Sequence, residues 1–212
     1  MARGRFITLE GGEGAGKSTQ SRLLADKLRS VGLVVVQTRE PGGTDGADAI
    51  RQLLVEGAAD RWDAKTELLL HYAARRDHVT RVIEPALKRG DWVVCDRFAD
   101  STMAYQGYGH GLGRPPIEAI DAAVLGGFKA DMTIIMDLDP AVGLERAHAR
   151  NPDASRYERL DLDFHERLRD GFLEIAAAEP GRCAVIDAAA GAPDAIAEHI
   201  WSLMTERLEV QV

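Results

Sequence analysis

One short segment carries the residue types that bind the phosphates of a nucleotide. Its glycines permit backbone conformations in which successive amide N–H groups turn toward one anion. A lysine and a serine end it, so an ammonium group can reach the outer phosphates and a hydroxyl can ligate Mg²⁺. The spacing is G-x-x-x-x-G-K-[ST], that of a phosphate-binding P-loop, and it covers Gly11, Gly12, Glu13, Gly14, Ala15, Gly16, Lys17 and Ser18.

The flanking sequence favours a P-loop over a glycine-rich turn that binds nothing. Residues 6–9 form an apolar run that predicts a buried strand, and helical spacing begins at Lys17. The helix would add the positive end of its dipole to the phosphate site. A later apolar strand, at residues 91–96, ends in Asp96, which is the Walker B pattern for a carboxylate beside Mg²⁺.

A tight turn follows the strand predicted for residues 33–36. Residues 38–44 (Thr-Arg-Glu-Pro-Gly-Gly-Thr) leave the carboxyl end of that strand, which is where open parallel sheets bind ligands. A plain connection would be as rich in glycine, but it would not need Arg39 and Glu40 together. We therefore predict that this turn belongs to the site. Thr44 is expected to cap a short helix that carries Arg51.

A long helix is predicted for residues 63–88, with a bend at Pro85. His71, Arg75 and His78 share one stripe of this helix, because side chains three and four positions apart lie on the same face. His71 and Arg75 can therefore address one ligand. A solvated polar stripe is equally compatible with this spacing.

The third predicted strand is followed directly by Arg97, which is unusual for a simple strand end. Residues 98–113 are polar and rich in glycine, and they contain Ser101, Tyr105 and Gln106. We expect this segment to be a loop that crosses the top of the sheet.

Arginines gather around a helix-breaking Asn-Pro-Asp sequence later in the chain. Arg146 and Arg150 share a face of the preceding helix, and Arg156 and Arg159 lie beyond the break. Four cations at such a position indicate a mobile lid, at about residues 146–160, that brings positive charge onto a phosphate. The alternative is a solvated helix end balanced by nearby carboxylates.

Alternating strands and helices predict one α/β domain over residues 1–212, with three layers and a five-stranded parallel sheet. No apolar run approaches the roughly 20 residues of a membrane span, and the first strand leaves no room for a signal peptide, so we expect a cytoplasmic protein with no membrane partner. The net charge of -8 argues against nucleic acid as a partner. Cys95 and Cys183 lie in apolar runs and are expected to be free core thiols.

Together these motifs resemble the thymidylate kinases of the bacterial type, within the P-loop nucleoside monophosphate kinases. The resemblance covers nearly the whole chain and is carried by residues 10–19, 38–44, 72–75, 96–98 and 101–107. The P-loop is shared by many families, whereas the other segments are more specific. The resemblance implies a P-loop NTPase fold and phosphoryl transfer from MgATP to dTMP, which gives dTDP and ADP for dTTP biosynthesis.

The resemblance also implies an acceptor pocket. Arg51 and Arg97 would hold the phosphate of dTMP, and Arg75 and Gln106 would hydrogen-bond the thymine edge. Glu13 would approach the deoxyribose 3′-hydroxyl. The other residues implied for this pocket are Arg39, Glu40, Pro41, His71, Asp96, Ser101 and Tyr105. The peptide bond between Glu40 and Pro41 is a candidate for the cis form.

The donor side follows from the same resemblance. Ser18 and Asp96 would hold the metal. Some members of the family carry an arginine inside the P-loop, but the variable positions here hold none, so the lid must supply it. We assign Arg150 to this role, beside Lys17 and Arg97 as catalytic cations. The residues implied to bind ATP are Gly11, Gly12, Glu13, Gly14, Ala15, Gly16, Lys17, Ser18, Thr19, Arg146 and Arg150.

Two positions depart from the family's pattern. His71 stands where a phenylalanine usually stacks on thymine, and His148 occupies a lid position where arginine is common. Because an unperturbed histidine gains charge below about pH 6.5, we expect the KM for dTMP to rise there. The second departure leaves open how Arg146, Arg150 and Arg156 divide the work of the lid.

Three other functions remain to be compared with this one. Another nucleotide or nucleoside kinase would differ only in its acceptor pocket. A GTP-dependent switch would need an Asn-Lys-x-Asp guanine reader, and the only asparagine, Asn151, precedes a proline. A DNA motor or transport ATPase would need a basic surface or partner-binding segments. The family resemblance further implies a homodimer, plausibly through the helix at residues 63–88, which has more apolar positions than one buried face requires.

Overall fold

The computed structural model describes residues 3–58, 60–150, 156–208 and 210. Its centre is a parallel sheet with the strand order β2-β3-β1-β4-β5. The strands are β1 (Phe6–Gly11), β2 (Val35–Arg39), β3 (Trp92–Asp96), β4 (Met132–Asp137) and β5 (Cys183–Asp187). The predicted α/β class and five-stranded sheet are confirmed, although β2 lies later in the chain than the run predicted for it.

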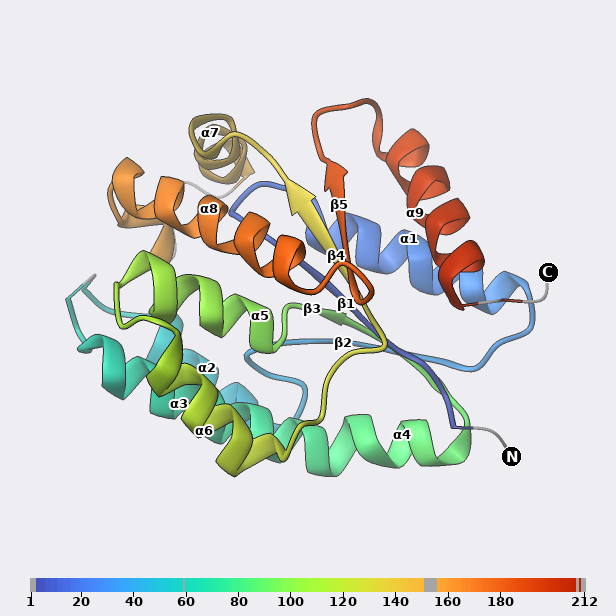
Figure 1. The fold of residues 1–212 in the computed structure, drawn as a ribbon, viewed down its shortest axis with the longest axis horizontal. Coiled ribbons are helices and arrows are strands. Elements are labelled where there is room, and N and C mark those ends of the chain that lie inside the picture. The colour runs from blue at the N-terminus through green and yellow to red at the C-terminus, as the bar shows by residue number, and fades with distance from the viewer. Residues whose placement is uncertain (1–2, 59, 151–155, 209, 211–212) are drawn as a thin grey trace.

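Helices cover both faces of the sheet (Figure 1). One face carries α1 (Lys17–Ser30) and α9 (Pro193–Leu208), which pack against each other. The helices that cover the opposite face are α3 (Ala64–His78), α4 (Glu84–Arg89), α5 (Ala99–Thr102), α6 (Arg114–Leu125) and α8 (Leu162–Ala178). The short helix α2 (Asp45–Val55) packs on α3, and α7 (Pro140–Arg150) packs on α8.

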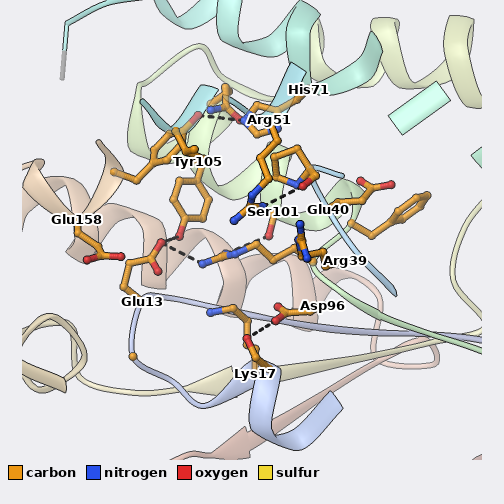
Figure 2. Close-up of a pocket in the computed structure, with 18 of the residues that line it drawn as sticks. Glu13, Lys17, Arg39, Glu40, Arg51, His71, Asp96, Ser101, Tyr105 and Glu158 are labelled. Atoms are coloured by element: carbon orange, nitrogen blue, oxygen red, sulfur yellow. Dashed lines mark hydrogen bonds and ion pairs between the residues drawn. The ribbon is translucent and has the colours of Figure 1, made fainter. Parts of the chain in front are cut away.

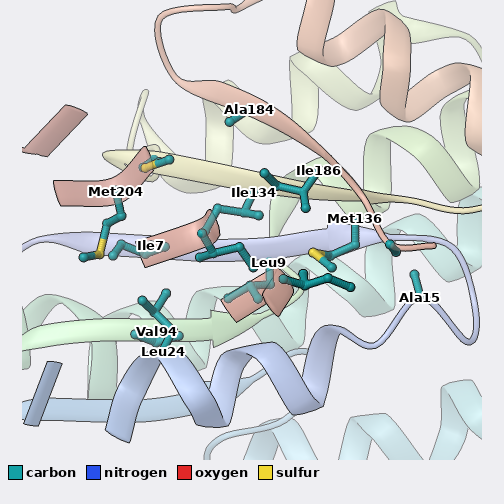
Figure 3. Packing of buried hydrophobic residues seen from close by; sticks show 14 of the residues in the cluster. Ile7, Leu9, Ala15, Leu24, Val94, Ile134, Met136, Ala184, Ile186 and Met204 are labelled. Carbon is teal, nitrogen blue, oxygen red and sulfur yellow. The ribbon is translucent and has the colours of Figure 1, made fainter. Parts of the chain in front are cut away.

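The central strand β1 is buried from end to end, and its side chains alternate between the two faces. Ile7 and Leu9 pack with Leu24 of α1 and Met204 of α9 (Figure 3). Phe6 points to the other face, into the cluster that α3, α4 and α6 cover. Because both faces are packed, the strand that leads into the P-loop is held rigidly.

The long predicted helix begins and ends close to the expected residues. The Asp63 carboxylate accepts hydrogen bonds from the backbone N–H groups of Lys65 and Thr66, which is an N-cap. A π-helical turn, Val79–Ile83, separates α3 from α4. Pro85 lies two residues after this turn, and its ring clashes with an ordinary α-helical turn before it, so the wider turn accommodates the proline.

The prediction of a loop at residues 98–113 is wrong over most of that range. The chain forms α5 and then a π-helical segment, Met103–Gly109. Its glycines permit close packing rather than chain reversal. A Cβ at Gly109 would lie 2.6 Å from the ring of Phe164, and one at Gly171 of α8 would lie 2.6 Å from Tyr108. The segment therefore packs against α8, which brings Tyr105 and Gln106 to fixed positions.

The two cysteines are buried free thiols, as predicted. Burial raises the pKa of Cys183 to about 12 and also raises that of Cys95, so neither forms a thiolate at neutral pH. Both therefore serve packing rather than chemistry. Within the described ranges, no helix is both long enough and apolar enough to cross a membrane.

We expect Gly109→Ala to destabilise the fold by about 1–3 kcal/mol, because the added methyl group must displace Phe164 or the backbone. Urea denaturation followed by circular dichroism measures this change. Gly181→Ala is the matched control, since a Cβ there meets nothing within 4 Å. Equal stability of the two variants would contradict the close packing of this segment against α8.

Candidate active site

The carboxyl ends of the parallel strands meet at one edge of the sheet, and a cavity of about 810 Å³ opens there. β1 leads into the P-loop, and the register places Asp96 at the end of β3 beside Leu9 of β1 and Arg39 of β2. Figure 2 shows Lys17 and Asp96 together, and Arg51 and His71 together some way beyond them. The cavity thus extends from the P-loop toward α2 and α3.

The P-loop is fixed by close backbone contacts. Gly11 and Gly14 both have positive φ, and a Cβ at either would collide with a carbonyl, of Met136 and of Gly143 respectively. Ala15 is buried in the core between these glycines and α1. The loop therefore holds its shape through packing on β4 and α7, and α1 begins directly after it.

Three polar side chains at the P-loop end of the cavity lie close together. Lys17 Nζ donates to the carbonyl of Gly12 at 2.5 Å, and burial together with the charge of Arg97 lowers its pKa to about 8. The ammonium form therefore predominates at neutral pH. Ser18 Oγ donates to Asp96 Oδ2 at 2.5 Å.

A hydroxyl beside a carboxylate is an oxygen donor set that suits Mg²⁺, which takes few protein ligands and completes its shell with water and phosphate. Among the described residues, no three His, Cys, Asp or Glu side chains form a cluster that could enclose a metal by themselves. Ser18 and Asp96 therefore fit a metal that binds together with nucleotide phosphates.

Arg97 connects the P-loop with the rest of the cavity. It has a φ of 70, which is rare outside glycine and is maintained here by the bonds of its side chain. Its Nη1 donates to the carbonyl of Gly11 at 3.0 Å and to Ser101 Oγ at 3.3 Å, and its Nη2 donates to Glu13 Oε1 at 3.0 Å. The guanidinium is thereby held at the boundary between the two parts of the cavity.

Glu13 is a half-buried carboxylate that receives two donors. Besides Arg97, the hydroxyl of Tyr105 donates to its Oε1 at 2.6 Å. Burial by itself raises the pKa of Glu13, but the charges of Arg97 and Lys17 outweigh it and lower the pKa to about 2. Glu13 is therefore ionised at neutral pH.

A second group of cations lies beyond Arg97. Arg51 Nη1 donates to the carbonyl of Pro41 at 2.9 Å, and the peptide bond between Glu40 and Pro41 is cis, as predicted. Burial, with the nearby charges of Arg39 and Arg97, lowers the pKa of Arg51. Three guanidinium groups that repel one another across this part of the cavity favour the binding of an anion.

Arg75 is 2% exposed and nearly saturated with acceptors. Its Nε donates to Glu40 Oε2 at 2.7 Å, and its Nη2 donates to the carbonyl of Phe98 and to Thr102 Oγ1. Glu40 Oε1 also lies 3.0 Å from His78 Nδ1. Arg75 Nη1 is buried and has no hydrogen-bond partner within the described part of the chain, although Arg75 lines the cavity.

Gln106 offers the cavity a hydrogen-bond acceptor, whereas Arg75 offers a donor. Its Nε2 donates to Glu67 Oε2 at 3.0 Å, and its Oε1 is buried with no hydrogen-bond partner among the residues described. Both Gln106 and Arg75 line the cavity. They offer one acceptor and one donor, which is the complement of a heterocycle that carries an N–H beside a carbonyl.

His71 lines the same end of the cavity, and its Nε2 lies 3.1 Å from the hydroxyl of Tyr157. Burial and the charge of Arg75 lower its pKa to about 3. His71 is therefore neutral at pH 6.5 and well below it. The expected rise of KM through protonation of His71 below about pH 6.5 is wrong, since that expectation used the pKa of an exposed histidine.

The predicted lid arginines are found in three different places. Arg150, at the end of α7, lines the cavity. Arg146 Nη1 lies 3.5 Å from the carbonyl of Ala188 and is not among the cavity residues. Arg156 is buried, donates to the carbonyl of Leu54 at 3.1 Å and pairs with Glu67. Residues 151–155 of the predicted lid lie outside the described residues.

The residues predicted for the acceptor pocket all line one cavity in the structure. The predicted residues that line the cavity on this side are Glu13, Arg39, Glu40, Pro41, Arg51, His71, Arg75, Asp96, Arg97, Ser101, Tyr105 and Gln106. Those from the predicted donor side are Glu13, Gly14, Gly16, Lys17, Ser18, Thr19 and Arg150. Gly11 and Gly12 instead line a small pocket behind the loop, and Ala15 packs in the core.

Arg159, one of the four predicted lid arginines, lines the cavity. Sequence analysis gave no individual role to several other lining residues, which are Val55, Glu56, Gly57, Phe98, Tyr157 and Glu158. It also missed Glu67, which lies behind the wall of the cavity against Gln106. Glu67 is one helical turn before His71, so the stripe of His71 and Arg75 could have been extended to it. No local pattern marks residues 55–57, which approach the site only because α2 packs on α3.

Comparison with known proteins agrees with this geometry. A family model described as thymidylate kinase matches residues 9–200. The chain is 58% identical over 208 residues to a thymidylate kinase of Caulobacter vibrioides, covering 98% of this chain and 99% of that protein. It is 50% identical over 206 residues to one of Rhizorhabdus wittichii, covering 97% and 99% respectively.

A crystal structure of thymidylate kinase from Ehrlichia chaffeensis superposes with a TM-score of 0.76 at 36% identity, and the match covers 95% of this chain and 99% of that one. The fold, the cavity and the family model therefore agree over almost the whole chain. The chain belongs to the thymidylate kinase family, whose members phosphorylate dTMP to dTDP.

Proposed function

We propose that this chain transfers a phosphoryl group from MgATP to dTMP inside the cavity at the carboxyl ends of the strands, with ATP at the P-loop end and dTMP between Arg97 and His71. The observation that supports this arrangement best is the pair of unpartnered buried atoms, Arg75 Nη1 and Gln106 Oε1, at the end remote from Lys17. Thymine offers O4 as an acceptor to the first and N3–H as a donor to the second.

The donor side follows from the P-loop geometry. Backbone N–H groups of the loop and the Lys17 ammonium bind the phosphates of ATP, and Ser18 and Asp96 hold Mg²⁺. The metal, when bound, neutralises charge on the phosphate oxygens. Arg146 belongs to α7, and its side chain donates to the carbonyl of Ala188. From this position it would support the nucleoside end of ATP.

On the acceptor side, Arg51 and Arg97 bind the phosphate of dTMP, and Arg39 adds charge from the rim. Glu13 is ionised and lies beside the Tyr105 hydroxyl, so it can accept a hydrogen bond from the deoxyribose 3′-hydroxyl. The reaction brings two anions together. Catalysis therefore consists mainly of positioning and of charge neutralisation by cations on both sides of the transferred group.

The last cation in this proposal is Arg150. It lines the cavity at the end of α7, where a lid at about residues 146–160 of a single domain spanning residues 1–212 would begin. From there its guanidinium can stabilise charge that develops on the transferred phosphoryl group, in place of the arginine that the P-loop lacks.

A coupled ADP assay with ATP and a panel of acceptors tests the reaction. We expect kcat/KM to be highest for dTMP, lower for dUMP, and lowest for UMP, AMP and GMP. Adenine has no N–H beside a carbonyl to offer Gln106 and Arg75, and the bicyclic bases of AMP and GMP are larger than the pyrimidine proposed for this end of the cavity. Preferential use of AMP or GMP would contradict the proposed acceptor.

We expect Arg150→Ala to lower kcat by about 10² or more and to change the affinity for dTMP little, because the lost cation acts on the transition state. Steady-state kinetics and calorimetric titration with dTMP measure the two quantities. Arg89→Ala, which removes an exposed arginine paired with Asp91, is the control. Near-normal turnover of Arg150→Ala would reject the assignment.

We also propose that two copies of the chain associate through α3 and α6. An open groove between these helices is lined largely by apolar residues, among them Leu69, Ala73, Ile120 and Val124, and Leu69 is 60% exposed. A second copy would cover this surface, which is consistent with the surplus of apolar positions on α3.

Light scattering should give the mass of a dimer for the unmodified chain and that of a monomer for Leu69→Asp, because a buried charge in the interface would be unpaired. Val34→Asp, at a residue that is 66% exposed and does not line this groove, should stay dimeric. A monomeric mass for the unmodified chain at micromolar concentration would contradict the proposal.

A further inference from the structure

Glu67 is a buried charge that touches the base end of the cavity only from behind. It is 0% exposed and is not one of the residues that line the cavity. Its Oε1 pairs with Arg156, and its Oε2 accepts from Gln106 Nε2 at 3.0 Å. The hydroxyl of Tyr157 lies 3.4 Å from the same oxygen, and so does His110 Nε2.

These contacts keep Glu67 ionised. Burial alone raises the pKa of a carboxyl group, but the nearby His110 and Arg156 outweigh this effect and hold the pKa of Glu67 below its ordinary value. An ionised carboxylate only accepts hydrogen bonds. Gln106 must therefore turn its N–H toward Glu67, because the reversed amide would place two oxygens about 3 Å apart without a proton between them.

The orientation of the Gln106 amide decides what the base meets. With Nε2 on Glu67, the buried Oε1 is left to face the ligand as an acceptor. Arg75 cannot change its character, because a guanidinium has only donors. The wall therefore offers a fixed donor at Arg75, whereas the group that it offers at Gln106 depends on Glu67.

Glu67 also reaches His71, through Tyr157. The Tyr157 hydroxyl donates to Glu67, so its oxygen accepts the proton of His71 Nε2 at 3.1 Å. This fixes the neutral imidazole with its proton on Nε2, since the low pKa of His71 excludes a second proton at neutral pH. Two side chains of the base pocket are consequently oriented by the same carboxylate.

We propose that Glu67 is a positioning residue that determines base selectivity, by holding the Gln106 amide so that the pocket accepts a pyrimidine with N3–H and O4 and rejects cytosine. The inference rests on the proposed function, since it concerns the acceptor pocket of that reaction. Cytosine has an acceptor at N3 and a donor at its 4-amino group. In this pocket its N3 would face the acceptor Oε1 of Gln106, and its amino group would face the donor Nη1 of Arg75. Both buried atoms would then be left unpaired.

The test compares dTMP with dCMP for the unmodified protein and for Glu67→Gln. A neutral glutamine at this position can donate to Gln106 Oε1, which allows the Gln106 amide to turn. We expect the ratio of kcat/KM for dTMP to that for dCMP to fall at least about tenfold, because sites that hydrogen-bond a substrate group discriminate strongly against analogues without it. The KM for dTMP should rise more than kcat falls, and the KM for ATP should stay within about twofold.

Arg156→Lys separates selectivity from disturbance of the buried ion pair, because it removes the guanidinium but keeps a cation beside Glu67, so that Glu67 stays ionised and keeps its contact with Gln106. Its dTMP to dCMP ratio should stay within about threefold of the unmodified protein. If Glu67→Gln does not fold, the double variant Glu67→Gln/Arg156→Gln, which leaves no unpaired charge, takes its place. Binding of dCMP is measured by calorimetry where turnover is too slow.

An unchanged ratio in Glu67→Gln, or an equal loss of selectivity in Arg156→Lys, would overturn the inference. Failure of the proposed function is a separate result. It would appear in the unmodified protein, as no turnover of dTMP, before any variant is compared. Turnover of dTMP by the unmodified protein with no effect of Glu67→Gln would refute only the role of Glu67.

Discussion

The ion pair between Arg97 and Glu13 joins the two halves of this active site. Glu13 belongs to the loop after β1, and Arg97 follows β3, which is the neighbour of β1 in the sheet. Sheet register fixes the distance between the two strand ends, and one half-buried guanidinium then ties the P-loop to the proposed acceptor pocket through Glu13, Gly11 and Ser101. Two anionic substrates can meet at a set separation only because this connection is rigid before either one binds.

Three arginines around the proposed acceptor side are each held by a carboxylate that is buried or half-buried. Glu13 holds Arg97, Glu40 holds Arg75 and Glu67 holds Arg156. Buried ion pairs are weak evidence for stability, since desolvation offsets much of the attraction. Their value here is geometric. A free arginine loses up to about 2 kcal/mol of side-chain entropy when a ligand immobilises it, whereas these side chains are ordered during folding.

The sequence predicted the parts of the site that depend on local spacing. The P-loop, Asp96 and the stripe of His71 and Arg75 were found in this way, and the cavity joins them. It failed where the cause is tertiary. Glycine content suggested a loop at Gly109, but the reason for that glycine is the ring of Phe164, far along the chain. The low pKa of His71 and the place of Arg156 likewise depend on burial, which no motif encodes.

Under the proposed function, base selectivity in this pocket would depend on the exclusion of water from its wall as much as on the hydrogen bonds that the wall offers. Arg75 Nη1 and Gln106 Oε1 are both inaccessible to bulk water, so a base that fits poorly leaves them unpaired at a cost of about 1–3 kcal/mol each. The penalty applies even to a base of the right size, and shape alone distinguishes bases of equal size poorly. Buried polar atoms with fixed orientation are therefore the feature by which a small pocket can separate thymine from cytosine.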